Sequence, residues 1–214
     1  MVPWMRNKST SASAEAYRAL RTNLLYDALV DTPSKVIALT SPGLREHKST
    51  VCANLGIVLA QADKRTLIVD CDLRDPVLHK TFGLRNSRGI ADALTGEWSL
   101  EEVWQEPLSG LKVIAGGPSP LEPTELLGSE RFAKFLGRVR QDFDHVLIDA
   151  PPLEPISDAA ILAAQSDGVL LVFDYKNTPK RNVQQAMRSL EAVRANVLGT
   201  VLTNVKVSKD ARRR

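Results

Sequence analysis

The chain has 214 residues, of which 43% are hydrophobic and 25% are charged, and its formal net charge is +3. This composition is ordinary for a globular protein with a sizeable core, and the length favours a single domain. The charge is too small to indicate nucleic-acid binding, and no segment approaches the roughly 18 consecutive apolar residues that would cross a bilayer.

The predicted elements alternate between helices and strands. Apolar residues at helical spacing predict a first helix over 13–30. The other predicted helices span 49–61, 89–94, 100–104, 125–143, 156–164 and 179–195, and the predicted strands span 35–40, 65–70, 111–115, 145–149, 168–173 and 197–204. The strands are nearly continuous apolar runs, as expected when both faces of a sheet are covered. This order predicts a doubly wound, mostly parallel α/β sheet flanked by helices, with an extra N-terminal helix.

The predicted domain spans residues 13–205, after a flexible segment over 1–12 and before a basic tail over 206–214. The tail fits either a solvated terminus or attraction to an acidic membrane surface. The first residues lack the apolar centre of a signal peptide. Cys52 and Cys71 stand in no paired arrangement typical of a zinc site or a disulfide framework, which favours a reducing, cytosolic compartment.

One candidate ligand loop follows the first predicted strand. Ligands of doubly wound sheets bind beyond the carboxyl ends of the strands, and SPGLREHKST (41–50) lies between such an end and a helix. Lys48 can supply positive charge, Ser49 a hydroxyl for magnesium, and Thr50 with the helix N-terminus further donors. The stretch therefore indicates a phosphate-binding loop, although a Lys-Ser-Thr run after a strand also arises by chance.

Two further strand ends carry carboxylates. Asp70 and Asp72 end LIVDCD and are followed by Arg74, and Asp149 ends VLID before two prolines. Such carboxylates can orient a magnesium-bound water or accept a proton from an attacking hydroxyl. Each also fits a helix cap or a turn when taken alone. Because all three motifs occur in order, each after an apolar strand, together they predict a nucleotide-binding site.

These segments resemble the bacterial tyrosine kinases of capsule and exopolysaccharide synthesis, which are relatives of the MinD/ParA group of P-loop ATPases. The resemblance runs from about Ser13 to Val205 and rests on LIVDCDLR, on VLIDAPP and on EAYRALR in the first helix. The last segment matches the family's ExxRxxR motif, through which subunits associate into a ring. Glu15, Arg18 and Arg21 would lie along one side of that helix.

The resemblance implies a chain that binds ATP with Mg²⁺ and transfers the γ-phosphoryl group to a tyrosine hydroxyl. The implied nucleotide-binding loop consists of Gly43, Leu44, Arg45, Glu46, His47, Lys48, Ser49 and Thr50. Lys48 would neutralise the phosphates and act in catalysis. Ser49, Asp70 and Asp149 would hold magnesium, and Asp70 or Asp72 would serve as the base.

The resemblance also implies partners. Asn204 ends the last strand where related P-loop proteins place an asparagine against adenine, although a strand-end asparagine also bonds to nearby backbone. Expected partners are further copies of the chain in a ring, a tyrosine-containing protein substrate, and a transmembrane activator or polysaccharide co-polymerase, fused or separate. The chain would then act in the cytoplasm at the inner face of the membrane, without nucleic acid.

Two departures from the family pattern stand out. Arg45 and His47 occupy slots that the family fills with glycine, which tolerates strained backbone and lets the loop approach phosphate closely. The family's usual C-terminal tyrosine cluster does not occur in this sequence, whose tyrosines are Tyr17, Tyr26 and Tyr175, so that either the tail was trimmed or the protein does not autophosphorylate in the usual way. The sequence thus predicts weakened kinase activity. A degenerate pseudokinase that acts as a regulatory subunit, or a MinD/ParA-like ATPase switch, are the alternatives.

Overall fold

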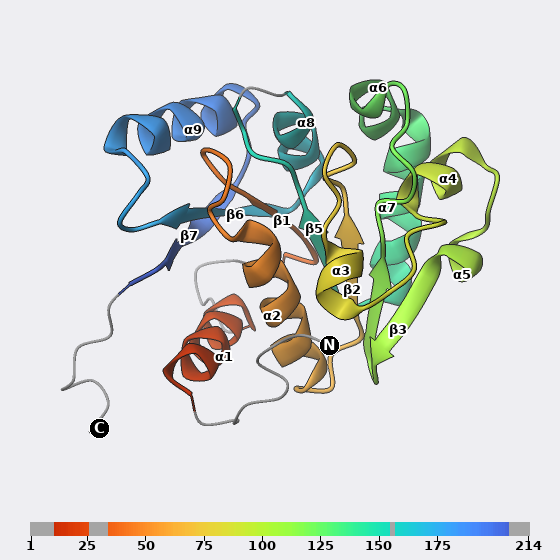
Figure 1. Cartoon of the computed structure of the whole chain (residues 1–214), viewed down its shortest axis with the longest axis horizontal. Coiled ribbons are helices and arrows are strands. Elements are labelled where there is room, and N and C mark those ends of the chain that lie inside the picture. The colour runs from red at the N-terminus through yellow and green to blue at the C-terminus, as the bar shows by residue number, and fades with distance from the viewer. Residues whose placement is uncertain (1–10, 26–33, 155–156, 206–214) are drawn as a thin grey trace.

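The computed structural model describes residues 11–25, 34–154 and 157–205 (Figure 1). Within them, one sheet contains strands in the order β3-β4-β2-β5-β1-β6-β7. The strands are β1 (Val36–Thr40), β2 (Thr66–Asp70), β3 (Trp104–Leu108), β4 (Leu111–Ile114), β5 (His145–Asp149), β6 (Gly168–Asp174) and β7 (Val197–Thr203). Neighbouring strands are parallel except for the antiparallel β3–β4 pair. The predicted doubly wound sheet is confirmed.

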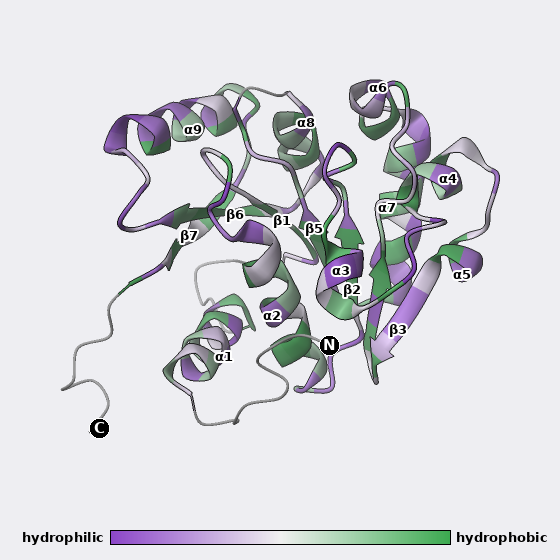
Figure 2. Ribbon diagram, in the orientation of Figure 1, coloured by the Kyte–Doolittle hydropathy of each residue, from purple (hydrophilic) through white to green (hydrophobic). Residues whose placement is uncertain are grey.

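Helices cover both faces of the sheet. One face packs against α1 (Ala12–Leu25), α2 (Lys48–Ala60) and α3 (Leu78–Phe82). The other packs against α4 (Ile90–Thr95), α5 (Leu100–Val103), α6 (Pro123–Leu127), α7 (Glu130–Asp142), α8 (Asp158–Gln165) and α9 (Lys180–Ala192). Strand side chains alternate between the faces, so Ile37 packs toward α2 while Ala38 packs toward the opposite layer. Figure 2 accordingly shows hydrophobic strands inside and a largely hydrophilic α9 outside.

The helix after the candidate loop, α2, lies between the sheet and α1. Residues 51–60 of α2 are all buried, and Tyr17, Leu20 and Leu24 of α1 pack against the same cluster. A helix buried on all sides is fixed firmly in place, so its first residues are presented at the carboxyl edge of the sheet. No helix in the described part of the chain is long and apolar enough to cross a membrane.

Several predicted boundaries are wrong. The long helix expected over 125–143 is two helices, because the Ser129 hydroxyl accepts a hydrogen bond from the Phe132 N–H and begins α7 anew. The helix expected over 100–104 ends at Val103, and the antiparallel strand β3 that follows was not predicted. The short helix α3 was also missed. Residues 26–30 and 156, parts of two predicted helices, lie outside the described residues.

Candidate functional site

Lys48 and three aspartates meet at the carboxyl edge of the sheet. β2 and β5 pair so that Asp70 lies opposite Asp149, and Asp72 follows two residues after the end of β2. The Lys48 Nζ atom, on the first residue of α2, lies 2.9 Å from Asp72 Oδ2 and 3.3 Å from Asp149 Oδ1. It also lies 3.4 Å from the Ser49 hydroxyl. The structure therefore brings together the residues that the sequence predicted for phosphate, magnesium and proton transfer.

Burial makes the charges of this cluster unfavourable without a further ligand. Burial raises the pKa of Asp70 to about 8, and the neighbouring charge of Asp149 adds to the increase. Burial also raises the pKa of Asp149, against the attraction of Lys48. Burial lowers the pKa of Lys48, but Asp149 and Asp72 outweigh it, so that this pKa is raised and the ammonium stays charged. One cation thus balances three buried acidic groups only in part.

Two carboxylate oxygens in the cluster have no partner among the described residues. Asp70 Oδ2 accepts hydrogen bonds from the Val77 and Leu78 N–H groups at 3.0 and 2.9 Å, and so caps α3. The other oxygen, Asp70 Oδ1, is buried without a hydrogen bond, as is Asp149 Oδ2. Such groups cost about 1–3 kcal/mol each when unsatisfied. Asp70 therefore both caps a helix and presents a free oxygen to the site.

The free oxygens fit magnesium. Mg²⁺ prefers oxygen ligands, and in phosphate sites it usually takes one or two carboxylates and completes its shell with water and phosphate oxygens. In the described ranges, no group of three His, Cys, Asp or Glu side chains is arranged to hold a metal without such help. Asp70, Asp149 and the Ser49 hydroxyl would supply protein oxygens, and the ion would neutralise the excess negative charge.

The candidate phosphate-binding loop, residues 43–50 and called the phosphate loop below, adopts left-handed backbone at two positions that lack glycine. Arg45 and His47 both have φ of 65°, in the left-handed region. These are the two slots at which the sequence predicts that the absence of glycine matters. Left-handed backbone costs a non-glycine residue on the order of 1–3 kcal/mol. The predicted strain is therefore present, and the loop nevertheless keeps the backbone form that glycine favours.

The remaining loop residues divide by where their side chains lie. Leu44 is 77% exposed, and the Ser41 hydroxyl donates to the Gly43 carbonyl oxygen at 2.7 Å. Glu46 is buried, and its carboxylate accepts hydrogen bonds from the Asp174 N–H and the Thr178 hydroxyl. The Glu46 side chain therefore faces β6, and only its backbone is available to a phosphate group. The local sequence pattern does not predict this contact.

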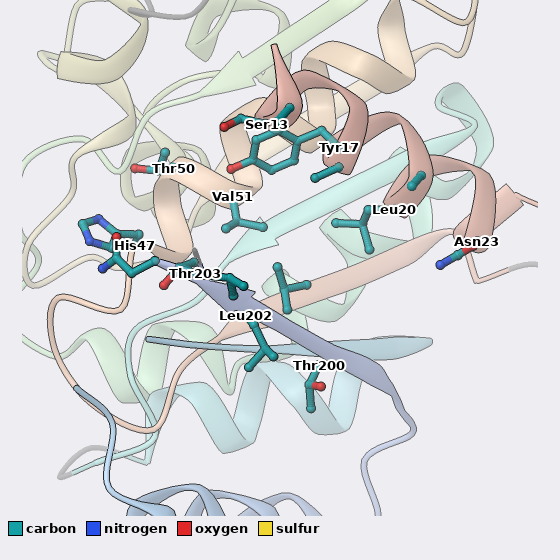
Figure 3. Close-up of a pocket in the computed structure, with 16 residues that line it drawn as sticks. Ser13, Tyr17, Leu20, Asn23, His47, Thr50, Val51, Thr200, Leu202 and Thr203 are labelled. Atoms are coloured by element: carbon teal, nitrogen blue, oxygen red, sulfur yellow. The ribbon is translucent and has the colours of Figure 1, made fainter. Parts of the chain in front are cut away.

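A groove of about 590 Å³ adjoins the loop (Figure 3). It lies between α1, the first turn of α2 and the end of β7, and it is lined among others by Tyr17, His47, Thr50 and Asn204. The Asn204 Nδ2 atom donates to Asp174 Oδ2 at 2.6 Å. The Asn204 side chain thus bonds to a side chain on β6, 30 residues away, and not to nearby backbone, and its amide oxygen accepts no hydrogen bond from the described residues.

The residues of the ExxRxxR motif make contacts within the chain. Arg18 pairs with Glu15 on α1, and the Arg21 guanidinium donates to the Val58 carbonyl oxygen at 3.1 Å. Arg21 therefore ties α1 to α2, a role that the sequence analysis missed. Tyr17, in the same helix, is partly buried, and burial raises the pKa of its hydroxyl. The association of subunits through this motif stays a prediction.

Arg74 follows Asp72 by two residues, and its side chain bonds to two residues that were not predicted from the sequence. Its Nε atom lies 3.0 Å from Asp158 Oδ2, and its NH2 group donates to the Thr124 hydroxyl at 3.2 Å. Thr124 in turn donates to Asp158 Oδ1 at 2.5 Å. Asp158 is buried at the start of α8. The sequence signal that could have indicated this contact was an acidic residue in the first turn of a predicted helix.

The fold and the site define a protein of the P-loop class. A phosphate loop joins a central strand to a buried helix, and aspartates end the neighbouring strands. The family model described as "AAA domain" matches residues 34–203. MinD from Pyrococcus horikoshii, solved with Mg-ADP, shares this fold at 19% identity and a TM-score of 0.67 over 84% of this chain and 76% of that one.

The chain belongs to the bacterial tyrosine kinase family. It is 36% identical to the tyrosine-protein kinase YwqD of Bacillus subtilis over 93% of this chain and 84% of YwqD. It is 32% identical to the tyrosine-protein kinase Wzc of Salmonella typhimurium over 92% of this chain but only 27% of Wzc. The kinase domain of Escherichia coli ETK superposes with a TM-score of 0.91 at 30% identity, covering 98% and 82% of the two chains. The resemblance stated from sequence is confirmed.

Proposed function

We propose that this chain binds ATP with Mg²⁺ and acts as a protein-tyrosine kinase domain in a polysaccharide synthesis and export system. The observation that carries the proposal is the cluster in which Lys48 contacts Asp72 and Asp149 beside two unpartnered carboxylate oxygens. Such a cluster destabilises the folded state of a protein that binds no cation, because its buried carboxylates repel one another. The names of the relatives, tyrosine-protein kinases, supply the reaction class.

The nucleotide would lie along the loop and the groove. Its phosphates would meet Lys48 and the free N–H groups at the start of α2, where the helix dipole favours negative charge. Its base would enter the groove beside Asn204. Since the Asn204 nitrogen is already bonded to Asp174, the amide oxygen is left as an acceptor. An acceptor matches the exocyclic amine of adenine and not the carbonyl oxygen of guanine.

In the proposed reaction, the tyrosine oxygen attacks the γ-phosphorus while the bond to the β-γ bridging oxygen breaks, and ADP leaves. Bound Mg²⁺ would neutralise charge on the phosphates. Asp72 would accept the proton of the tyrosine hydroxyl, because it lies at the edge of the cluster and Asp70 is already engaged with α3. Lys48 would hold the phosphates, and most of the rate would come from positioning.

A regulatory pseudokinase is the second candidate. The observation in its favour is that Arg45 and His47 impose backbone strain on the loop. Autophosphorylation at Tyr17 is also expected to be weak, since this tyrosine is partly buried. Tyr175 is 64% exposed and is an acceptor available on the described surface, whereas Tyr26 lies outside the described residues.

Partners follow from the same proposal. The chain would associate into a ring through Glu15, Arg18 and Arg21, and a fused or separate membrane activator or co-polymerase would bring it to the inner face of the membrane. The longer relatives, such as Wzc, support a fused form, because the matched part is about a quarter of their length, whereas YwqD, matched over 84% of its length, supports a separate one. Sedimentation would test the ring: Arg18→Ala should lower the mass of the assembly, and an unchanged mass would exclude this motif as the contact.

A phosphotransfer assay tests the kinase proposal against the pseudokinase. Purified protein, ATP and a tyrosine-rich peptide are incubated with and without Mg²⁺, and phosphotyrosine is mapped by mass spectrometry. The kinase proposal predicts Mg²⁺-dependent phosphorylation of the peptide, with little on the chain itself, and none with Asp72→Asn. Nucleotide binding without any transfer to several peptides would favour the pseudokinase. Robust labelling of Tyr17, Tyr26 or Tyr175 would show that the strain in the loop does little harm.

A further inference from the structure

Glu46 is a buried acid between exposed residues of the phosphate loop. Only 7% of its surface is accessible, whereas Leu44, Arg45 and His47 around it are exposed. An acidic side chain next to a phosphate site would repel the ligand if it faced the loop, so its burial on the other side needs an explanation. Buried carboxylates persist when they are bonded to donors. The contacts of Glu46 show which donors these are.

Glu46 bonds the phosphate loop to two strands. Its Oε2 atom accepts a hydrogen bond from the Asp174 N–H at 2.6 Å, at the carboxyl end of β6, and another from the Thr178 hydroxyl, in the turn that follows. Its backbone carbonyl oxygen accepts from the Thr203 hydroxyl at 3.3 Å, at the end of β7. Buried carboxyl groups are retained where such hydrogen bonds satisfy them. One residue therefore fastens the loop to the neighbouring sheet edge.

The segment that receives Glu46 is itself well ordered by hydrogen bonds. The buried Asp174 carboxylate accepts from the Lys176 and Asn177 N–H groups and from the side-chain amides of Asn177 and Asn204. Hydrogen bonds from the Asn177 and Asn204 side chains outweigh burial and lower the pKa of Asp174 to about 2. This acid therefore stays ionised and bonded at neutral pH, and the turn after β6 is a fixed base for Glu46.

The residues on either side of Glu46 explain what the bonds achieve. Arg45 and His47, its direct neighbours, both have φ of 65°. Non-glycine residues hold such backbone only where surrounding contacts enforce it. We propose that Glu46 is a positioning residue whose carboxylate, held by Asp174 and Thr178, keeps Arg45 and His47 in the left-handed form that family members obtain from glycine. Its effect on ligand affinity rests on the proposed function, whereas its effect on the loop does not.

The first test measures how readily the loop opens, by amide hydrogen exchange, without any nucleotide. Amide hydrogen exchange of the peptide over 43–51 is compared in the wild type, Glu46→Ala and Thr178→Val. Thr178→Val removes one donor without changing the loop sequence and with little change in volume. Both variants should exchange faster in this peptide. Ser129→Ala, which removes the cap of the remote helix α7, is the control that lowers stability without touching the loop. Unchanged exchange of this peptide in both loop variants would overturn the proposal.

The second test asks whether the role is tied to strain. ADP affinity in Mg²⁺ is measured for Glu46→Ala in the wild-type chain and in a chain carrying Arg45→Gly and His47→Gly. The substitution should weaken binding about tenfold in the first background and about threefold or less in the second, because glycines need less enforcement. Equal losses in both would overturn the link to strain. If no variant binds nucleotide while the loop still loosens, the proposed function fails and the positioning role stands.

Discussion

The carboxylate cluster at the ends of β2 and β5 and the phosphate loop after β1 meet at Lys48, but they are stabilised differently. The cluster has the residue types expected of the family, yet it contains raised pKa values and unpartnered oxygens. The loop departs from the family pattern at Arg45 and His47, yet Glu46 bonds it firmly to β6 and β7. The cluster therefore needs a ligand to complete it, whereas the loop is completed by the chain itself.

The largest effect is expected where the two regions meet. Lys48→Met should abolish Mg²⁺-dependent nucleotide binding, because it removes the phosphate contact and leaves buried carboxylates without their cation. Breaking a buried pair costs about 3–5 kcal/mol, so the midpoint of thermal unfolding without nucleotide should also fall. Calorimetric titration and thermal unfolding would measure both. Lys134→Met, which breaks an exposed pair with Glu130, is the matched control. Binding within threefold of wild type would contradict the role of Lys48.

The pH dependence of stability tests the cluster alone. Asp70 has a pKa of about 8 in the folded chain and about 3.9 when unfolded. The folded state therefore binds more protons between these values, and the nucleotide-free protein should lose stability as pH rises from about 5 to 8. A single group contributes at most about 1.4 kcal/mol per pH unit. Urea unfolding at several pH values would measure the slope.

Asp70→Asn should flatten that slope, since asparagine keeps an oxygen for the cap of α3 but cannot ionise. Asp144→Asn is a suitable control, because its partner Arg65 lowers the pKa of Asp144 and its effect falls at more acidic pH. A wild-type profile that is flat or rising over this range would show that the cluster is not short of positive charge.

The loop offers a smaller effect of opposite sign. Arg45→Gly with His47→Gly should tighten ADP binding by about tenfold, because both residues hold left-handed backbone at a cost. Leu44→Gly is a matched control: it adds a glycine to the same loop at a position where φ is not positive. Tightening by the control alone, or weaker binding by the double variant, would show that the loop gains from its side chains more than it loses to strain.

The smallest effect is expected at the end of the groove. Asn204→Ala should reduce the preference for ADP over GDP by about threefold to tenfold, the worth of one hydrogen bond to the base. Asn177→Ala removes another donor to Asp174 without facing the groove, and it separates loosening of the turn from loss of a base contact. Competition binding would measure both. Equal changes in selectivity for the two variants would leave Asn204 a structural role only.

The sequence predicted the cluster better than its surroundings, for physical reasons. Asp70, Asp72 and Asp149 each follow an apolar strand, and parallel strands bring their ends to one edge, so chain order sufficed. The helix α3 was missed because its cap is Asp70, seven residues before Val77 and on another element. β3 was missed because Pro107 interrupts a short edge strand. The anchoring of Glu46 could not be predicted, since its partners Asp174 and Thr178 lie 128 and 132 positions further along the chain.

The most direct test of the central claim is an ADP titration by calorimetry with Mg²⁺ and again with excess EDTA, for the wild type and for Asp149→Asn. If the unpartnered oxygens of Asp70 and Asp149 await a magnesium-bound nucleotide, the wild type should bind ADP in Mg²⁺ and at least about tenfold more weakly in EDTA. Asp149→Asn should show little of this difference. Equal binding of ADP with and without Mg²⁺, or no binding in either, would contradict the account.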